Sequence, residues 1–399
     1  MRVYDVLIIG GGPAGLSALH NLTCNGYQAL LFERGSHYQN RLQQTSPYNI
    51  ANGLGGAGLL SDGKYSFSPA ASSFWRNINV SIAEIAYEKV RRIVLHSGVN
   101  FPNWDNDWAN VSDRYDGVKE YNTIYSSQQE QTIIVDYMYN RHNVYLDTEI
   151  TCISKHGDAY FVRDNNGHCH YGKNIILSTG KHGANLLRSS NIGCKFDYKI
   201  EAGVRVECST QTFLPYLEKS IDYKRIEAVD SHTQIRTFCC CKTGRVVQSF
   251  SDGFHSYNGI KDRHAENSNI GVLIRSEDPQ SVYATEFVRT IPNMIPTASS
   301  LALFLNGFHS LFGSNDDNLI KSFILKIVDS TNCLALESAL IYSPEVEYFG
   351  YYPCFETNSL KIANEHVWIS GDVSGKYRGL LAALMSGIYV SEEIIREGY

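Results

Sequence analysis

The sequence predicts an α/β fold in which a domain built on a parallel sheet is interrupted by an inserted domain of mixed α+β structure. Three observations predict it: a strand, glycine turn, helix and strand at the start, a change of texture after Glu201, and a return of the opening pattern near the end. The 399 residues allow two or three domains at roughly 150 residues each. With 43% hydrophobic and 19% charged residues, the composition excludes disordered, collagen-like and coiled-coil proteins.

The opening unit is the most readable part of the chain. Tyr4 to Ile9 is apolar and rich in β-branched residues, as a buried parallel strand should be. A glycine turn leads from it into an amphipathic helix at Ala14 to Leu22, and a short strand follows at Gln28 to Phe32. These elements predict one βαβ unit that ends at the acidic residue Glu33.

The turn in this unit has the pattern Gly10-x-Gly12-x-x-Gly15. Its glycines allow a tight turn, a close approach of the backbone to a pyrophosphate, and close packing of the helix on the strand. The helix N-terminus adds N–H groups and the positive end of its dipole. Glu33 lies 18 residues beyond Gly15, the spacing of an acid that accepts hydrogen bonds from a ribose 2′-hydroxyl. The unit is therefore predicted to be a Rossmann-like site for a dinucleotide.

A second stretch, Gly53-x-Gly55-x-x-Gly58, fits the same pattern but lacks its context. No apolar strand precedes it and no helix-forming run follows it. The segment from Gly53 to Phe67 has no periodicity and is predicted to be an extended loop. We expect a glycine-lined loop that lies against the cofactor rather than a second nucleotide site, with simple loop flexibility as the alternative.

The remaining elements are predicted from apolar periodicity and turn residues. Helices are expected at Ile82 to His96 and Ser126 to Asn140. Strands are expected at Val144–Leu146, Ile150–Ser154, Tyr160–Arg163, Asn174–Thr179, Val204–Val206, Ile235–Cys241, Arg245–Phe250 and Ile270–Ile274. We place a discontinuous dinucleotide-binding domain at 1–65, 141–200 and 343–399, a substrate domain at 201–342, and a helical and irregular excursion packed on the first domain at 66–140.

The C-terminal segment, residues 366–396, favours FAD over NAD as the dinucleotide. His366 to Ser370 is a further apolar strand, Gly371-Asp372 is its turn, and Gly379 to Arg396 is a long helix. A carboxylate in this turn can accept hydrogen bonds from a ribityl chain, which FAD has and NAD lacks. The N-terminus of the helix would stabilise negative charge at the pyrimidine edge of reduced flavin. FAD is therefore the expected cofactor, with NAD(P)H left open as a transient electron donor.

Several segments resemble those of known flavoproteins. IIGGGPAG with Glu33, STG at Ser178 to Gly180, and GDVSGKYRGLLAALMSG at Gly371 to Gly387 are similar to the cofactor segments of two-domain FAD oxidoreductases of the glutathione-reductase-like fold. GLGGAGLLSDGK, GVRVE, RTFCCCKTGRVV and LIYSPEVEYFGY resemble the FAD-dependent dehydrogenase family of bacteria and plastids, whose substrates are mostly unassigned. The resemblance implies hydride transfer between flavin and a small organic molecule at the junction of two domains.

The motifs and the resemblance give two sets of candidate residues. Those expected to bind FAD are Gly10, Gly12, Pro13, Ala14, Gly15, Glu33, Arg34, Gly55, Gly56, Ala57, Thr179, Gly180, Gly371, Asp372, Lys376, Gly379 and Leu380. The catalytic candidates, which the resemblance implies to be near the flavin ring, are Lys64, Arg236, Cys239, Cys241, His255 and Arg378. Two alternatives stay open: Arg236 as a substrate-binding fork or a structural salt bridge, and Lys64 as a site residue or a solvated loop lysine.

The cysteines leave three interpretations. Cys239 and Cys241 lie two residues apart, so they share a face if the segment is a regular strand. Buried structural thiols are favoured over a substrate-facing thiol, and a redox pair comes last because such strand positions strain a disulfide. No metal site is expected, since no second pair has zinc-ligand spacing and His168-Cys169-His170 is expected in an exposed hairpin.

Charge and hydropathy limit the partners. The net charge of −6 is scattered, which argues against nucleic acid and anionic membranes. No stretch approaches the ~20 apolar residues of a membrane helix, so we expect a cytoplasmic protein that acts on a small molecule. Two alternatives are an FAD-dependent monooxygenase or hydroxylase on the same scaffold, and a binding or escort protein without catalysis. The sequence makes no prediction of an oligomeric state.

Overall fold

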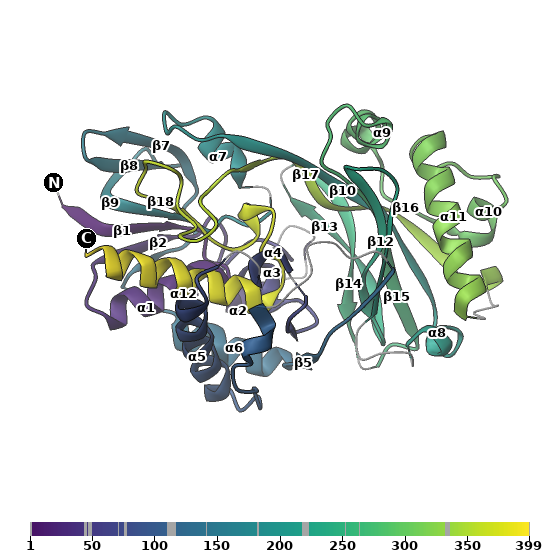
Figure 1. The fold of residues 1–399 in the computed structure, drawn as a ribbon, viewed down its shortest axis with the longest axis horizontal. Coiled ribbons are helices and arrows are strands. Elements are labelled where there is room, and N and C mark those ends of the chain that lie inside the picture. Colours follow the sequence, from purple (N-terminus) through teal and green to yellow (C-terminus); the bar gives the residue numbers. More distant parts are fainter. Residues whose placement is uncertain are drawn as a thin grey trace. The chain divides into compact units, whose positions relative to one another are not determined.

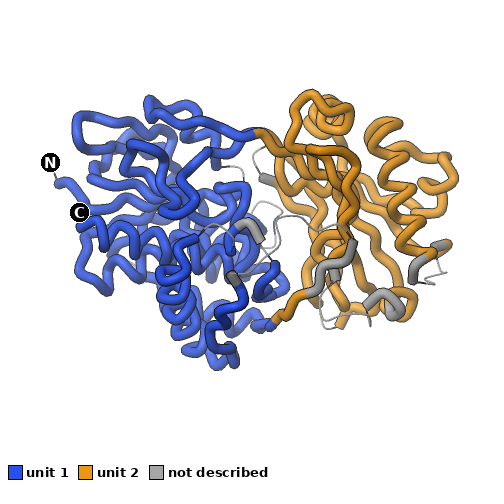
Figure 2. Tube along the Cα trace, in the orientation of Figure 1, with its two compact units in different colours: residues 1–113, 124–197, 351–399 blue, residues 114–123, 198–350 orange. Residues whose placement is uncertain are grey.

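The computed structural model describes residues 2–43, 46, 50–70, 72–75, 78–109, 117–140, 142–181, 183–217, 223–251, 253–262, 264–331 and 336–398. The chain forms two compact units, one of residues 1–113, 124–197 and 351–399 and one of residues 114–123 and 198–350 (Figure 2). In the described ranges, no helix combines the length and the apolar character needed to cross a bilayer.

The first unit is built on a seven-stranded sheet of β1 (Val3–Ile9), β2 (Ala29–Phe32), β6 (Val144–Tyr145), β7 (Ile150–His156), β8 (Ala159–Asp164), β9 (Cys169–Leu177) and β18 (Val367–Ile369). Its order is β6-β2-β1-β9-β8-β7, with β18 also paired to β9 (Figure 1). β6, β2, β1, β9 and β18 pair in parallel, and β7 and β8 add an antiparallel edge. The parallel strands contain buried apolar runs, at residues 6–9 of β1, throughout β2 and at residues 175–177 of β9, as expected of an α/β sheet with both faces covered, and the predicted α/β class is confirmed.

Helices and short elements complete this unit. The helices α1 (Pro13–Cys24), α12 (Leu380–Glu397), α5 (Val80–His96) and α6 (Gln128–Met138) pack on one another. A capping box of Ser127 and Glu130 starts α6, and Asn79 caps α5. The smaller elements are α2 (Tyr38–Gln43), α3 (Gly56–Leu59), β3 (Lys64–Ser66), α4 (Ser72–Trp75), η1 (Asn106–Ala109), β5 (Thr123–Tyr125), α7 (Ala184–Arg188) and η4 (Gly371–Ser374). The extended loop predicted at Gly53 to Phe67 was wrong in part, because it contains α3 and β3.

The second unit is built on another seven-stranded sheet. Its strands, in spatial order, are β16 (Thr297–Ser300), β17 (Leu340–Pro353), β10 (Phe196–Ser209), β15 (Asn267–Ser276), β12 (Thr233–Cys241), β11 (Tyr223–Ala228) and β4 (Gly117–Glu120). The pairs from β10 to β4 are antiparallel, as is β16 with β17. Residues 114–123, which contain β4, lie in sequence within the predicted excursion at 66–140. In the structure they belong to the second unit. The chemical role of each unit stays a prediction.

The two faces of the second sheet differ. One face packs with α9 (Val282–Thr290) and α11 (Ser314–Thr331) in an apolar core that includes Ile200, Ala202 and Val204 of β10. The intervening residues of β10 point the other way, because side chains alternate along a strand, and they are Lys199, Glu201, Arg205 and Glu207. The hairpin of β13 (Gly244–Ser251) and β14 (Phe254–Lys261) packs on part of this polar face. The other elements are α8 (Thr210–Leu217), η2 (Ile291–Asn293), α10 (Leu301–Leu305) and η3 (Leu336–Ser338).

Candidate functional site

The turns after β1, β2, β9 and β18 lie side by side at the carboxyl edge of the first sheet. Three backbone hydrogen bonds join neighbouring strand ends: Gly10 N to Phe32 O (2.8 Å), Ser178 N to Ile9 O (2.8 Å) and Ser370 N to Leu177 O (3.0 Å). Segments from the beginning, middle and end of the chain thus form one surface. This edge is where α/β proteins bind their ligands.

Two glycines of the first turn are required by packing. A Cβ on Gly10, whose φ is +105°, would lie 2.4 Å from the carbonyl oxygen of Ser178. A Cβ on Gly15 would lie 1.9 Å from the carbonyl oxygen of Gly10. Gly12 is the N-cap of α1, so no side chain occupies the end of the helix. The N-terminus of α1 is left open to an anion.

Glu33 organises the backbone of this edge. Its buried carboxylate accepts hydrogen bonds from three main-chain N–H groups, from Gly11 at Oε2 (2.7 Å) and from Gly35 (2.8 Å) and Gly53 (3.0 Å) at Oε1. A carboxylate has about four acceptor positions, so one remains at Oε2 for a ribose hydroxyl. The structure shows that Glu33 joins three loops, which the sequence did not predict, and its contact with a ribose stays a prediction.

The glycine loop, residues 53–58, lies against the first turn. Gly55 N donates to Gly11 O at 2.9 Å, and a Cβ on Gly56 would lie 2.9 Å from the Cα of Gly12. The loop therefore packs beside the predicted dinucleotide turn. Its contact with a cofactor stays a prediction.

Arg41 holds the glycine loop in place, and no motif or periodicity in the sequence indicates this role. Its fully buried guanidinium donates to the carbonyl oxygens of four residues: Ile50, Gly53, Leu54 and Gly56. Burial lowers the pKa of Arg41 to about 10, and Glu33 opposes that shift. Arg41 comes from a polar stretch without periodicity, so only its position in the fold reveals its function.

The opening and closing helices are in direct contact. Ser17 Oγ on α1 donates to Leu384 O on α12 at 2.9 Å. A Cβ on Gly387 would lie 2.0 Å from Ala14 O, so the two helices touch through their backbones. Gly371 N donates to Ser386 Oγ at 2.8 Å, which fixes the turn after β18 to α12. The C-terminal turn is thereby held beside the first turn.

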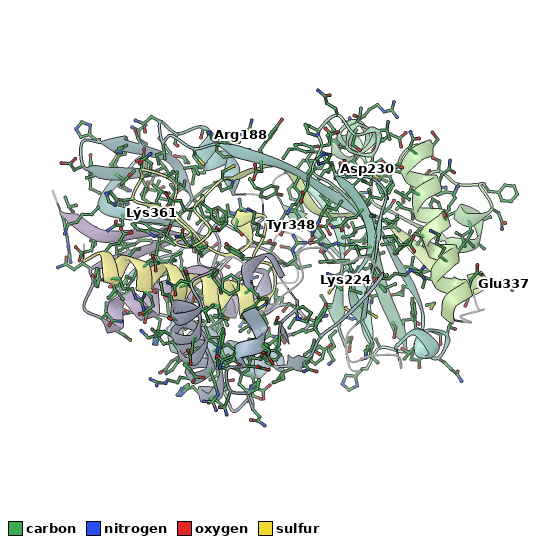
Figure 3. All side chains as sticks on the ribbon, viewed as in Figure 1. Arg188, Lys224, Asp230, Glu337, Tyr348 and Lys361 are labelled. Carbon is green, nitrogen blue, oxygen red and sulfur yellow. The ribbon has the colours of Figure 1, made fainter. Side chains whose placement is uncertain are left out.

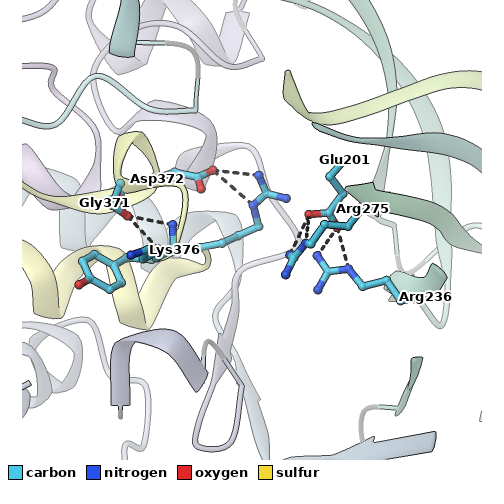
Figure 4. A network of polar contacts seen from close by, with 9 residues as sticks. Glu201, Arg236, Arg275, Gly371, Asp372 and Lys376 are labelled. Carbon is cyan, nitrogen blue, oxygen red and sulfur yellow. Dashed lines mark hydrogen bonds and ion pairs between the residues drawn. The ribbon is translucent and has the colours of Figure 1, made fainter. Parts of the chain in front are cut away.

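Asp372 and Arg378 form an ion pair in this turn (Figure 4). Arg378 Nε and Nη2 each lie 3.3 Å from Asp372 Oδ2, and both side chains are partly exposed. Lys376 lies with its Nζ 5.2 Å from the centre of the Phe355 ring. Gly379 is the N-cap of α12 and carries no side-chain cap, so this helix start is also open.

The donors and acceptors of this edge fit a dinucleotide with a polyol chain. The carboxylates of Glu33 and Asp372 can accept hydrogen bonds from hydroxyls, and the N-termini of α1 and α12, which have no side-chain cap, can donate to anionic groups. The hydroxyl of Thr179, the second residue after β9, is buried and has no hydrogen-bond partner among the described residues. Such an atom suits a site that takes a polar ligand.

The other candidates of the first unit lie as follows. Arg34 Nε donates to Asn52 Oδ1 at 2.8 Å, behind the glycine loop. Lys64 Nζ lies 3.9 Å from Asp62 Oδ2, and both side chains are largely buried, so Lys64 is not a solvated loop lysine. The remaining cofactor candidates follow the predicted turns: Pro13 and Ala14 start α1, Ala57 lies in α3, Gly180 follows β9, and Leu380 starts α12.

In the second unit, Arg236 makes a buried salt bridge. Its guanidinium bonds to Glu201 Oε1 through Nε (2.7 Å) and Nη2, and Glu201 is fully buried (Figure 4). Of the two interpretations of Arg236, the structure shows the salt bridge. Its use as a substrate fork stays a prediction.

The cysteine segment is not a regular strand. Pairing of β12 with β15 shifts register between Phe238 and Cys241, and Cys239 has a φ of +39°. A bulge therefore breaks the regular strand on which the prediction was based, but the Sγ atoms of Cys239 and Cys241 still lie within 4.8 Å of each other, so the two thiols share a side. Cys240 packs in the apolar core, and all three cysteines are reduced.

The histidine candidates lie in hairpins. His255, at the start of β14, is exposed and its Nδ1 lies 3.1 Å from Gln248 Nε2. His168 and His170 both follow the predicted turn between β8 and β9, and each has a ring nitrogen 3.3–3.4 Å from Asp164 Oδ2. The His168 side chain is 73% exposed, as expected, whereas the His170 side chain is 17% exposed because its ring packs on Phe32 and Tyr145.

Comparisons with known proteins give a likeness in fold. No family model and no curated protein sequence matches the chain. Glycine oxidase from Geobacillus kaustophilus is 12% identical, with 99% of this chain and 95% of that chain covered and a TM-score of 0.45. 2,6-dihydroxypyridine-3-hydroxylase from Arthrobacter nicotinovorans is 10% identical, with 99% of this chain and 82% of that chain covered and a TM-score of 0.45. CtdE in complex with FAD and a substrate is 9% identical, with 98% of this chain and 84% of that chain covered and a TM-score of 0.41. At such identities no residue role carries over from these proteins.

Proposed function

We propose that the chain is an FAD-dependent oxidoreductase that transfers a hydride between flavin and a small organic substrate. One observation carries the proposal: the glycine turn after β1, the acid Glu33 after β2 and the acid Asp372 after β18 meet at one edge of a parallel sheet. A dinucleotide with a ribityl chain needs these three features together.

Each part of this edge has a role in holding the cofactor. The open N-terminus of α1 binds the diphosphate, and the remaining acceptor position of Glu33 binds a ribose hydroxyl. Asp372 accepts from the ribityl hydroxyls, and the N-terminus of α12 stabilises negative charge at the pyrimidine edge. FAD, when bound, supplies the group that accepts or donates the hydride.

The second unit is proposed as the substrate domain. Its sheet carries charged side chains on the face opposite the helices, which suits recognition of a polar small molecule. The resemblance of GLGGAGLLSDGK and LIYSPEVEYFGY to FAD-dependent dehydrogenases favours a dehydrogenase or reductase over a monooxygenase. NAD(P)H is the proposed transient electron donor.

The first test is whether the purified protein holds flavin. We expect a yellow protein with flavin absorbance, released as FAD on denaturation. A colourless protein that cannot be reconstituted with FAD would contradict the proposal. Oxygen consumption that requires NADPH and substrate would favour the monooxygenase alternative.

The second test is the variant Asp372→Asn. It removes a charged acceptor, so we expect FAD to bind about 10- to 100-fold more weakly, the equivalent of a charge-assisted hydrogen bond. Asp5→Asn is a matched control: Asp5 is also a partly exposed carboxylate in an ion pair, with Lys173 at 2.9 Å, but it lies at the amino-terminal end of β1. Fluorescence titration of each apoprotein with FAD measures the affinities of the two variants. Equal affinities in the two variants would exclude the role of Asp372.

A further inference from the structure

The bulge in β12 brings two thiols of the second unit together. Three steps along β12, from Phe238 to Cys241, match two steps along β15, so this part of the strand is contracted. Cys239 lies inside the contracted part and has a φ of +39°, in the left-handed region that few non-glycine residues adopt. The Sγ atoms of Cys239 and Cys241 lie within 4.8 Å of each other. We call these two residues the dithiol.

The residue before the bulge is held by two cations. The ring centre of Phe238 lies 5.4 Å from Nζ of Lys224, which is labelled in Figure 3, and 5.6 Å from Cζ of Arg236. Cation–π contacts of this kind stabilise the ring in its place. They anchor β12 where the bulge begins.

The bulge removes the objection to a disulfide that regular strand geometry raises. In an extended strand, Cα atoms two residues apart are separated by about 6.7 Å, at the outer limit of the distances that a disulfide spans. The dithiol lies in a contracted segment instead, and its two sulfur atoms are already on one side. An S–S bond of about 2.05 Å then requires a further approach that rotation of the two side chains can supply.

The three neighbouring cysteines differ in their surroundings. Cys240 is 7% exposed and packs in the apolar core on the helical side of the sheet. Cys241 is buried under the β13–β14 hairpin, where a Cβ on Gly244 would lie 3.0 Å from Cys241 Cβ. Cys239 is partly exposed. A reagent from solvent therefore meets Cys239 first, and Cys241 is the thiol beside it.

A buried guanidinium lies next to the dithiol. Arg205 Nη1 donates to Cys239 O at 3.1 Å, and a Cβ on Gly259 of β14 would lie 2.4 Å from this nitrogen and 2.9 Å from Cys241 Sγ. Although burial opposes the shift, the pKa of Arg205 is raised, first by Glu345 and then by negative charge on the two sulfur atoms. This attraction is mutual, so the guanidinium favours the thiolate form of both cysteines. The carboxylate of Glu345, 2.5 Å from Arg205, acts against this preference.

We propose that Cys239 and Cys241 form a reversible disulfide when a peroxide oxidises them. The Cys239 thiolate attacks one oxygen of hydrogen peroxide, the O–O bond breaks, and a sulfenic acid and hydroxide are formed. The Cys241 thiol then attacks the Cys239 sulfur, the S–O bond breaks, and the thiol proton leaves with the hydroxyl group as water. Two thiols thereby give two electrons to the peroxide, and a reducing thiol restores them by exchange. The site goes beyond the proposed function, because the reaction requires no flavin.

A second pair of neighbouring thiols has surroundings that disfavour the same reaction. In the first unit, Cys194 Sγ lies 3.7 Å from Cys354 O. Burial raises the pKa of both thiols to about 11, and a hydrogen bond with Asp197 adds to the shift at Cys354. These thiols stay protonated at neutral pH, so they should react with peroxide more slowly than the dithiol.

Peptide mapping of the full chain after exposure to hydrogen peroxide tests the proposal. Tryptic cleavage after Arg236 and Lys242 gives one peptide, residues 237–242, that holds all three cysteines. We expect the wild-type peptide to lose two hydrogen atoms and to regain them with dithiothreitol. Cys239→Ser should slow the reaction of this peptide about tenfold, because the partly exposed thiol is lost. Cys241→Ser should stop at a sulfenic acid on Cys239, which dimedone labels.

Cys240→Ala is the matched control within the peptide, and Cys194→Ser is the control outside it. Both variants should form the disulfide at the wild-type rate. A wild-type peptide that keeps three thiols, or that is oxidised to a sulfinic acid without a disulfide, would overturn the proposal. Loss of the disulfide in folded Cys240→Ala would overturn it as well. If a cysteine variant does not fold, fragment ions of the wild-type peptide locate the bond, and a bond to Cys240 contradicts the proposal. None of these results depends on whether the protein binds flavin.

Discussion

The two units handle charge by different means. At the carboxyl edge of the first sheet, backbone N–H groups from three loops surround Glu33, and glycines let those loops approach one another. On the polar face of the second sheet, Glu201 is surrounded by two guanidinium groups instead. A site built from backbone dipoles keeps its polarity at any pH, whereas a site built from ionised side chains depends on charge balance.

The largest expected effect is that of Glu201→Gln. Removing this carboxylate leaves two arginines with an uncompensated buried charge, so we expect a loss of about 3–5 kcal/mol in the free energy of unfolding. Glu227→Gln is the matched control, because Glu227 also bonds to two cations, Arg225 and Lys326, but is partly exposed, and its loss should stay under about 1 kcal/mol. Urea denaturation measures both. Similar losses would show that burial of the charge does not distinguish the two sites.

A smaller effect is expected from Gly15→Ala at the backbone-built site. The new methyl group would meet the carbonyl oxygen of Gly10, and such overpacking costs about 1–3 kcal/mol. Gly193→Ala is the control, because a Cβ there meets no atom within 4 Å, and we expect a change within about 0.5 kcal/mol. Thermal unfolding followed by circular dichroism compares them. Equal stability of the two variants would show that the turn adjusts to a side chain.

The third prediction concerns pH and the helical side of the second sheet. Asp316 is fully buried in the first turn of α11, and neither of its carboxyl oxygens has a partner among the described residues. Burial raises the pKa of Asp316 to about 9, and the negative charges of Glu286 and Asp317 contribute to the same shift. Between pH 4 and 9 the native state therefore holds a proton that the unfolded state releases, and stability falls as pH rises, by at most about 1.4 kcal/mol per unit.

Asp316→Asn removes this dependence. We expect the variant to gain stability over the wild type as pH increases from 5 to 8, because an amide does not ionise. Asp329→Asn, which replaces an exposed carboxylate of the same helix, should follow the wild type. Denaturation midpoints of the wild type and both variants, measured at four pH values, test this prediction. A constant difference between Asp316→Asn and the wild type would show that Asp316 is ionised in the native state.

Much of the first unit was predictable, since its signals are local. The apolar run of β1, the glycine turn and Glu33 lie within 33 residues, and each has a steric or hydrogen-bonding reason at short range. Arg41 was missed because nothing near it in the sequence indicates that four carbonyl oxygens converge on it. The bulge at Cys239 was missed as well, because it depends on how β12 pairs with β15.

The sequence by itself determined the parallel strands, the glycine turns and the acids at strand ends, because periodicity and the absence of a side chain act within a few residues. Only the tertiary structure decided where those ends meet and which charges balance. Glu201 and its two arginines are 35 and 74 residues apart, and strand register alone brings them together. Register depends on the whole sheet, so this buried ion-pair network is not visible in any single segment.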